Sequence, residues 1–206
     1  MFHVKQREPL PEAPVSRETE TRLRAYLDLL LAWNARINLI APATEATAWE
    51  RHVLDSWQLL PLLPARGALV DLGSGGGLPG LVLAIGRTEE THLVESDRRK
   101  AAFLLEAART LGLAHVRVQP QRIEAARLPK AAVVTARALA PLELLVAQAH
   151  GILAPGGVAV FPKGRQAEDE LTAAAPHWFM RVERFASRTD AEATIFRLSE
   201  IRPAGA

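Results

Sequence analysis

The stretch VDLGSGGGLPG, residues 70–80, holds two overlapping glycine patterns that decide the expected fold. Residues 73–77 form a G-x-G-x-G pattern behind the acidic Asp71, whereas residues 75–80 form a G-x-G-x-x-G pattern. A glycine-rich turn between a strand and a helix lets the backbone approach a nucleotide-like ligand closely. Both patterns therefore predict a nucleotide-binding turn, but they favour different ligands.

Short apolar runs alternate with helical stretches after this turn begins. The runs that predict strands are residues 68–72, 91–94, 115–119, 132–136 and 157–161. The stretches that predict helices are residues 79–85, 98–111, 123–126 and 142–150. This alternation predicts an α/β fold with a mostly parallel, Rossmann-like sheet and helices on both faces. Two alternating runs near the end, residues 180–185 and 194–198, predict a terminal pair of strands joined by a hairpin-like turn.

The segment before the turn is expected to be helical. Residues 1–15 are rich in proline and predict a loose arm. Ser16 is a predicted N-cap, and apolar residues recur at helical spacing from there to residues 33–34. A second helix is predicted from about Thr44 or Thr47 to Leu60. We therefore expect an arm and helical extension over residues 1–64, a main domain over 65–201 and a frayed tail over 202–206.

Composition is typical of a single globular α/β domain with a modest extension. The chain has 206 residues, of which 49% are hydrophobic and 23% are charged. It lacks a predicted membrane span or signal peptide, so we expect a cytoplasmic protein with no membrane partner. It contains no cysteine, which excludes disulfides, thiolate metal sites and cysteine nucleophiles.

The charge balance permits a nucleic-acid partner. The formal net charge is +2 and the sequence pI is about 9.4, with arginine carrying most of the positive charge. Arginine is suited to bidentate phosphate contacts and to stacking on bases. An arginine-rich surface that reflects only a biased genome explains the composition equally well.

Three features favour S-adenosylmethionine over a nicotinamide dinucleotide. Asp71 ends the first predicted strand, where a carboxylate can face a cationic amino acid moiety but would repel a pyrophosphate. The dinucleotide pattern would begin at Gly75, several residues past the end of that strand. Tyr26 is the only tyrosine and precedes the glycines, so no Tyr-x-x-x-Lys pair follows them. Glu95 ends the second strand and can bind a ribose under either interpretation.

Each of these residues also has a purely structural interpretation. The glycine cluster can be a plain turn, Asp71 an N-cap and Glu95 a solvated strand-end acid. We favour the cofactor site because all of them occur in the right order on a strand-turn-helix-strand pattern.

Several blocks resemble the bacterial small-subunit (16S) ribosomal RNA guanine-N7 methyltransferases, long called glucose-inhibited division protein B. The blocks, which include the glycine-rich run, are YLDLLLAWNARINLIAP, RHVLDSWQLLP, DLGSGGGLPG, LVESDRRKAAFL, QRIEAA, VVTARALAPL and FPKG. Together they cover residues 26–164, and the RHVLDS and TARA blocks are more specific than any glycine motif. The chain after Gly164 matches less well. The resemblance implies a class I S-adenosylmethionine-dependent methyltransferase that modifies N7 of a guanosine in 16S ribosomal RNA.

The resemblance also implies site residues wherever motifs match. It places Gly73 and Leu78 against the methyl donor, and it places Arg137 at the reaction cleft. Arg122 and Lys163 are expected near the substrate. The full expected cofactor set is Asp71, Gly73, Gly75, Gly77, Leu78, Glu95, Ile123, Glu124 and Arg137. Within it, Ile123 and Glu124 frame the adenine.

The residue content agrees with methyl transfer to an endocyclic nitrogen. N7 of guanine offers a neutral lone pair, so positioning suffices and no base has to remove a proton. Methylation of pyrimidine C5 by the usual route needs a cysteine nucleophile, and methylation of an exocyclic amine is associated with an (Asp/Asn/Ser)-Pro-Pro-Tyr loop; the sequence has neither. We expect Arg137 and Lys163 to hold phosphates or the guanine O6 and N7 edge.

The block around Arg51, His52 and Asp55 allows two interpretations. Helical spacing puts Arg51 or His52 beside Asp55, which predicts a buried network tying the helical segment to the sheet. A role in gripping the substrate is equally compatible with the sequence. The six histidines are scattered and have no metal-ligand spacing, so we expect no catalytic metal.

Two rival functions stay open on sequence grounds. One is a methyltransferase acting on a small molecule or a protein, whose substrate affinity would not depend on salt as RNA binding does. The other is a ribosome-binding or RNA-binding module without turnover, which would not bind S-adenosylmethionine. We expect the chain to act as a monomer.

Overall fold

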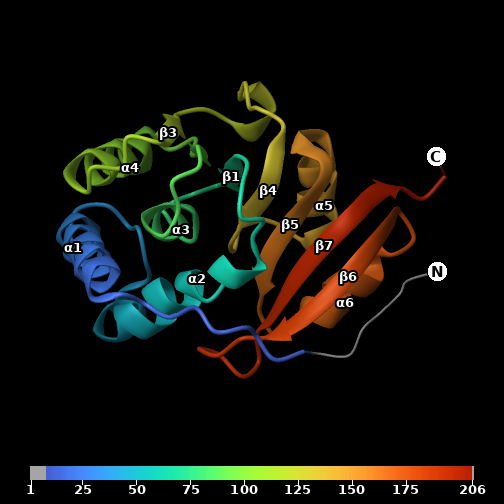
Figure 1. The fold of residues 1–206 in the computed structure, drawn as a ribbon, viewed down its shortest axis with the longest axis horizontal. Coiled ribbons are helices and arrows are strands. Elements are labelled where there is room, and N and C mark those ends of the chain that lie inside the picture. Colours follow the sequence, from blue (N-terminus) through green and yellow to red (C-terminus); the bar gives the residue numbers. More distant parts are fainter. Residues whose placement is uncertain (1–7, 206) are drawn as a thin grey trace.

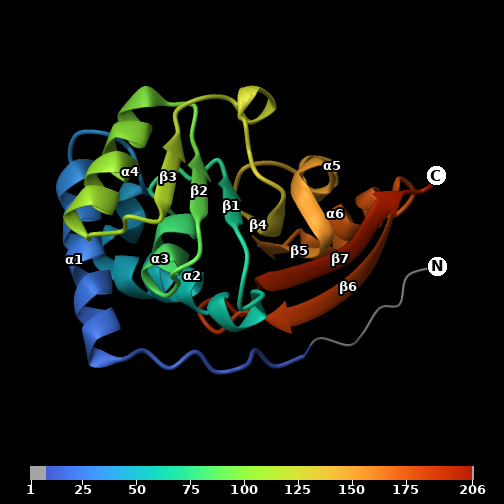
Figure 2. The same ribbon diagram turned by 45° about the horizontal axis from the view of Figure 1, so that its top comes forward.

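The computed structural model describes residues 8–205, which form a seven-stranded mixed sheet in the order β3-β2-β1-β4-β5-β7-β6. Strands β1 to β5 run parallel, and β7 pairs antiparallel with both β5 and β6 (Figure 2). The strands are β1 (Leu69–Leu72), β2 (Thr91–Val94), β3 (Val116–Gln119), β4 (Ala131–Ala136), β5 (Leu153–Lys163), β6 (Trp178–Ala186) and β7 (Thr194–Pro203). The predicted parallel sheet and terminal hairpin are confirmed.

Helices cover both faces of the sheet, because its central strands are apolar on both sides (Figure 1). One face packs against α1 (Arg17–Asn34), α3 (Gly80–Ile85) and α4 (Arg98–Thr110). The other packs against α5 (Leu142–Ile152) and α6 (Ala167–Ala174). Alternation along β1 explains the division: Val70 and Leu72 belong to the core under α5, whereas Leu69 faces the opposite side.

The predicted second helix is not one regular helix. It is divided into a 3₁₀ turn η1 (Pro42–Thr47), a π-helical segment η2 (Trp49–Leu54), the short α2 (Asp55–Trp57) and a 3₁₀ turn η3 (Leu60–Leu62). Val53 and Trp57 are buried, so the apolar spacing that suggested a helix was sound. The prediction of one uniform helix was wrong because long-range contacts with Arg137, described below, favour a wider helical turn in the middle of this segment.

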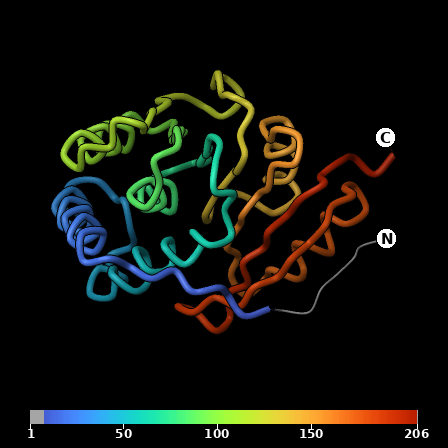
Figure 3. Tube along the Cα trace, viewed as in Figure 1, coloured from blue at the N-terminus to red at the C-terminus, as the bar shows by residue number. Residues whose placement is uncertain are grey.

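Two predictions about the ends of the chain were also wrong. Residues 8–15 are not a loose arm: the Glu8 amide donates to Arg184 O at 2.8 Å, and Leu10 is buried. The segment crosses from α1 to the terminal hairpin (Figure 3). The rest of the predicted arm, residues 1–7, lies outside the described residues. The predicted frayed tail begins too early, because β7 continues to Pro203 by pairing with Trp178.

The helix predicted over residues 123–126 is instead the short 3₁₀ turn η4 (Ile123–Ala125). α6 was not predicted, and β5 covers Leu153–Lys163 rather than residues 157–161. Both differences bear on the cleft, since Pro162 and Lys163 at the end of β5 and Glu170 of α6 line it.

Candidate active site

The turn after β1 begins at Gly73, which settles how the two glycine patterns lie on the fold. Gly73, Gly75 and Gly77 have φ of +63°, +53° and +82°, a backbone region that L side chains rarely adopt. Gly80 is instead the first residue of α3 and packs on β1: a Cβ there would lie 2.6 Å from Asp71 Cβ. The G-x-G-x-G pattern therefore forms the turn, and Gly80 permits close packing of helix and sheet.

Asp71 is fully buried beneath the turn. Its Oδ1 accepts a hydrogen bond from Thr135 Oγ1 of β4 at 2.6 Å. Burial raises the pKa of this carboxyl to about 6, although the Thr135 hydrogen bond opposes the shift. Asp71 thus links β1 and β4 below the glycine turn, and its expected contact with a methyl donor stays a prediction.

Glu95 holds the glycine turn from the end of β2. Its Oε2 accepts the Gly75 amide at 2.8 Å, and its Oε1 accepts the Asp97 amide at 2.7 Å. The side chain is largely buried, with the residue 8% exposed. Because a carboxylate has about four lone-pair sites, these two bonds leave capacity for a further donor such as a ribose hydroxyl. The structure therefore adds a loop-anchoring role to the predicted ribose contact.

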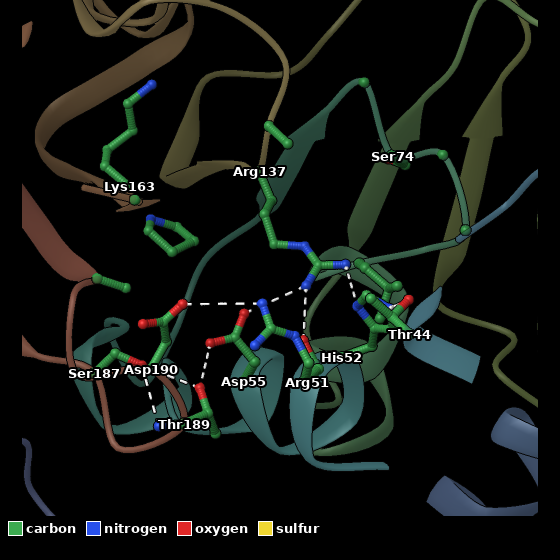
Figure 4. Close-up of a pocket in the computed structure, with 18 of the residues that line it drawn as sticks. Thr44, Arg51, His52, Asp55, Ser74, Arg137, Lys163, Ser187, Thr189 and Asp190 are labelled. Carbon is green, nitrogen blue, oxygen red and sulfur yellow. Dashed lines mark hydrogen bonds and ion pairs between the residues drawn. The ribbon is translucent and has the colours of Figure 1, made fainter. Parts of the chain in front are cut away.

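A cleft of about 620 Å³ opens beside the glycine turn. Gly73, Gly75 and Leu78 line one wall, as do Ser74 and Gly76. The remaining lining comes from five places far apart in the sequence: the segment 39–55, Lys100 of α4, the end of β4, the end of β5 with Glu170, and the loop 187–193. Figure 4 shows side chains from these segments converging on the cleft. Two of the predicted substrate residues, Arg137 and Lys163, line it together.

Arg137, at the end of β4, is held by residues of the 49–57 segment (Figure 4). Its Nη1 donates to Asp55 Oδ2 and to the Arg51 carbonyl, each at 3.3 Å. Its Nη2 lies 3.3 Å from His52 Nδ1. The Arg137 and Asp55 side chains are only 19% and 16% exposed. The predicted network between helix and sheet therefore exists, but Asp55 pairs with Arg137 of the sheet rather than with Arg51 or His52.

His52 is a neutral member of this network. Burial, together with the positive charge of Arg137, lowers the pKa of His52 to about 4. Its Nδ1 faces an Arg137 donor and must accept, so the ring proton resides on Nε2 and is donated to Thr44 Oγ1 at 2.8 Å. Thr44 in turn donates to the Ala41 carbonyl at 2.7 Å. The chain of hydrogen bonds runs from Arg137 through His52 into η1.

Lys163 forms a second ion pair at the cleft, with side-chain exposures of 8% for Lys163 and 24% for Glu170. Its Nζ lies 2.6 Å from Glu170 Oε2 and donates to the Ala140 carbonyl at 2.8 Å. Glu170 Oε2 also accepts the Leu142 amide, at 2.7 Å, at the start of α5. The pair therefore fixes the loop between β4 and α5, which carries Ala138 at a strained φ of +52°. In Figure 4 Lys163 points away from the Arg137 group.

Four other predicted residues lie outside the cleft lining, as Asp71 and Glu95 do. Arg122 is exposed and caps η4, where Ile123 is partly buried against the α5 core and Glu124 is exposed. Their expected roles beside the adenine and the substrate stay predictions. Gly77 lies under the turn against Leu81 and supports its shape.

Sequence reasoning missed the cleft residues Glu170, Thr189 and Asp190. All three belong to the part of the chain after Gly164, where the sequence resemblance was weak. Asp55 and His52 belong to the RHVLDS block, and the specificity of that block was the signal in the sequence that pointed to them. Among residues 8–205, no three His, Cys, Asp or Glu side chains gather where they could hold a metal ion. No helix in that range is long and apolar enough to cross a membrane.

Comparison with known proteins matches the chain to one family over most of its length. A family described as rRNA small subunit methyltransferase G matches residues 19–194. The chain is 59% identical over 198 residues to ribosomal RNA small subunit methyltransferase G of Acidiphilium cryptum, covering 94% of this chain and 90% of that protein. It is 57% identical over 192 residues to the protein of the same name from Rhodospirillum centenum, covering 93% and 88%.

Solved structures show the same fold at low sequence identity. A SAM dependent methyltransferase from Aquifex aeolicus superposes with a TM-score of 0.58 at 12% identity, covering 84% of this chain and 96% of that one. The likeness confirms a Rossmann-like methyltransferase fold for the sheet and its helices.

Proposed function

The chain belongs to the rRNA small subunit methyltransferase G family, and from this premise we propose that it transfers a methyl group from S-adenosylmethionine to N7 of a guanosine in 16S ribosomal RNA. The observation that carries the proposal is the cleft itself. It brings the glycine turn, which fits a nucleoside-containing ligand, together with Arg137 from the TARA block. Binding the methyl donor and the acceptor base in one cleft is the requirement for in-line transfer.

The glycine turn fits the methyl donor. A Cβ at Gly75 would meet only the Gly73 carbonyl, at 3.9 Å, so the cleft side of the turn is open to a ligand. Gly73, Gly75 and Leu78 would contact the donor from the cleft wall, and Glu95 would accept from its ribose. S-adenosylmethionine supplies an electrophilic methyl group on a sulfonium. Ile123 and Glu124 would frame its adenine, on the strength of the QRIEAA block alone.

The acceptor side needs positioning rather than a base. N7 of guanine has a neutral lone pair, and methylation leaves the base cationic. Arg137 and Lys163 would hold phosphates or the O6 and N7 edge. The guanidinium has five N–H donors, and its contacts within the described residues engage three of them. Asp55 and Glu170 offset the charge of the two cations, so the cleft can present donors without adding full positive charge beside a sulfonium.

Substrate RNA would approach the cleft as a single-stranded or unstacked segment, because N7 of a paired guanine lies in the deep, narrow major groove of an RNA helix. Arg122 would lie near the RNA path. We expect the chain to bind RNA as a monomer in the cytoplasm. Affinity should fall with added salt, since phosphate contacts release counterions.

The test is to incubate the protein with labelled S-adenosylmethionine and small-subunit ribosomal RNA lacking the modification. Naked RNA, assembly intermediates and complete subunits are compared, and the labelled base is mapped. We expect label at N7 of one guanosine. Label in no RNA state would overturn the proposal, whereas label in a protein or small molecule would favour a different methyltransferase.

A further inference from the structure

Asp55 connects three segments that are far apart in the sequence. Its Oδ2 pairs with Arg137 Nη1 at 3.3 Å, at the end of β4. Its Oδ1 accepts from Thr189 Oγ1 at 2.6 Å, in the loop between β6 and β7. The same oxygen accepts from Gln58 Nε2 at 2.8 Å. The two hydrogen bonds to Oδ1 hold the carboxylate with Oδ2 toward Arg137, so Asp55 has little freedom to turn away.

Gln58 holds the loop 187–193, whose Thr189 in turn holds Asp55. The residue is 5% exposed, and its Nε2 lies 3.0 Å from Ser187 Oγ and 3.2 Å from Thr189 Oγ1. Its Oε1 accepts the Arg188 amide at 2.8 Å. The terminal hairpin is therefore bound to the helical segment by a buried amide. Such networks hold one geometry well when each member is satisfied.

The second acidic residue at this wall of the cleft lacks these features. Asp190 Oδ2 lies 3.9 Å from Arg51 Nη2, and the two side chains are 39% and 53% exposed. A pair of this kind is screened by water and holds neither partner strongly. The contrast isolates Asp55 as the carboxylate that sets the position of Arg137.

We propose that Asp55 is a positioning residue for methyl transfer: it fixes the Arg137 guanidinium at the cleft and is itself fixed by Thr189 and Gln58. The inference rests on the proposed function and gives a role to Asp55, for which the resemblance implied none. Without Asp55, the guanidinium keeps only its contacts with the Arg51 carbonyl and His52 and loses its fixed position at the cleft. This loss of position acts on the transfer step rather than on binding of the methyl donor.

The experiment compares Asp55→Asn with wild type in steady-state methylation of the RNA state that wild type accepts. We expect kcat to fall at least about tenfold while KM for S-adenosylmethionine stays within about twofold, because the glycine turn is untouched. Glu168→Gln is the matched control: it removes a carboxylate from another arginine pair, Glu168 with Arg184, outside the cleft lining. We expect the control to keep wild-type kcat.

A double-mutant cycle with Arg137→Lys separates positioning from a merely structural role. If Asp55 acts through Arg137, adding Asp55→Asn to Arg137→Lys should lower kcat by less than about twofold more. Multiplication of the two single effects would overturn the proposal, as would wild-type kcat in folded Asp55→Asn.

If Asp55→Asn does not fold, Thr189→Val tests the same proposal, since it removes the hydroxyl that donates to Asp55 and keeps the Asp55 carboxylate. We expect kcat to fall about threefold with unchanged KM for S-adenosylmethionine. Unchanged kcat in folded Thr189→Val would then refute the proposal. Absence of methylation by wild type would refute the proposed function instead, so the two failures are distinguishable.

Discussion

The two walls of the cleft are built in different ways. The glycine wall comes from one continuous segment, β1 to the start of α4, in which Glu95 holds Gly75 at 2.8 Å. The opposite wall is assembled from the segment 49–57, the end of β4 and the loop 187–193, which meet at Asp55 and Arg137. The first wall depends on local backbone geometry and the second on side-chain contacts over long sequence separations. Changes to the first should therefore act on folding and donor binding, and changes to the second on transfer.

Gly80→Ala should have the largest effect, because it places an atom between α3 and β1. The new Cβ would lie 2.6 Å from both Asp71 Cβ and Leu93 Cδ2, within a buried contact that has no room to relax. We expect the free energy of unfolding to fall by about 3 kcal/mol. Urea unfolding measures it.

Gly151→Ala is the control for that substitution. Gly151 lies in α5 and a Cβ there meets nothing within 4 Å. We expect a gain of about 0.5–1 kcal/mol from helix propensity. Equal stability of the two alanine variants would contradict the close-packing role of Gly80.

Arg137→Ala tests the opposite wall. The fold should survive, since the side chain is at the cleft, but methyl transfer should fall at least about a hundredfold, equivalent to about 2.7 kcal/mol in the barrier. Single-turnover labelling of RNA measures the rate, and circular dichroism checks the fold. Arg109→Ala is a suitable control, because Arg109 forms an exposed pair with Glu106 within α4. Ordinary turnover in Arg137→Ala would show that the arginine has no part in the reaction.

His52 makes the opposite wall sensitive to pH. Its pKa falls from 6.5 to about 4 in the folded protein, so between these values the unfolded chain binds a proton that the folded chain does not. Stability should therefore decrease as pH falls from about 6.5 to about 4. Since the residue is only half-buried, we expect a loss of about 1–2 kcal/mol.

His52→Asn keeps an acceptor near Arg137 and does not titrate. Urea unfolding of both proteins at about pH 7.5 and about pH 4.5 should show wild type losing more stability than the variant. The same loss in both proteins would contradict the assignment to His52.

Tyr26→Phe should have the smallest effect, at the point where α1 supports the glycine wall. Tyr26 is fully buried and its hydroxyl donates to the Gly76 carbonyl at 2.6 Å. Burial raises the pKa of this hydroxyl, which therefore stays a donor. Its loss leaves a carbonyl unpaired and should cost about 1 kcal/mol. Calorimetry should also show weaker S-adenosylmethionine binding; unchanged affinity would limit Tyr26 to a role in stability.

Features that depend on residues close together in the sequence were predicted correctly, whereas contacts between distant segments were not. The order of the strands along the chain, most of the helices between them and the glycine turn all followed from neighbours along the chain. The resemblance supplied Arg137 and Lys163, and both line the cleft. It did not reveal that each is paired with a carboxylate, because Asp55 is 82 residues from Arg137 and Glu170 lies on α6, a helix that was not predicted.

The sequence by itself determined the parallel sheet and the turn that begins at Gly73, because periodicity and glycine conformation are local properties of the chain. Only the tertiary structure decided that residues 49–54 widen into a π-helix and that residues 8–15 pack against the terminal hairpin. It also decided that Asp55 contacts Arg137 and Thr189. These outcomes depend on residues that the sheet and its terminal hairpin bring together from distant parts of the chain. Free energy from such contacts outweighs the local preference for a regular helix or a loose arm.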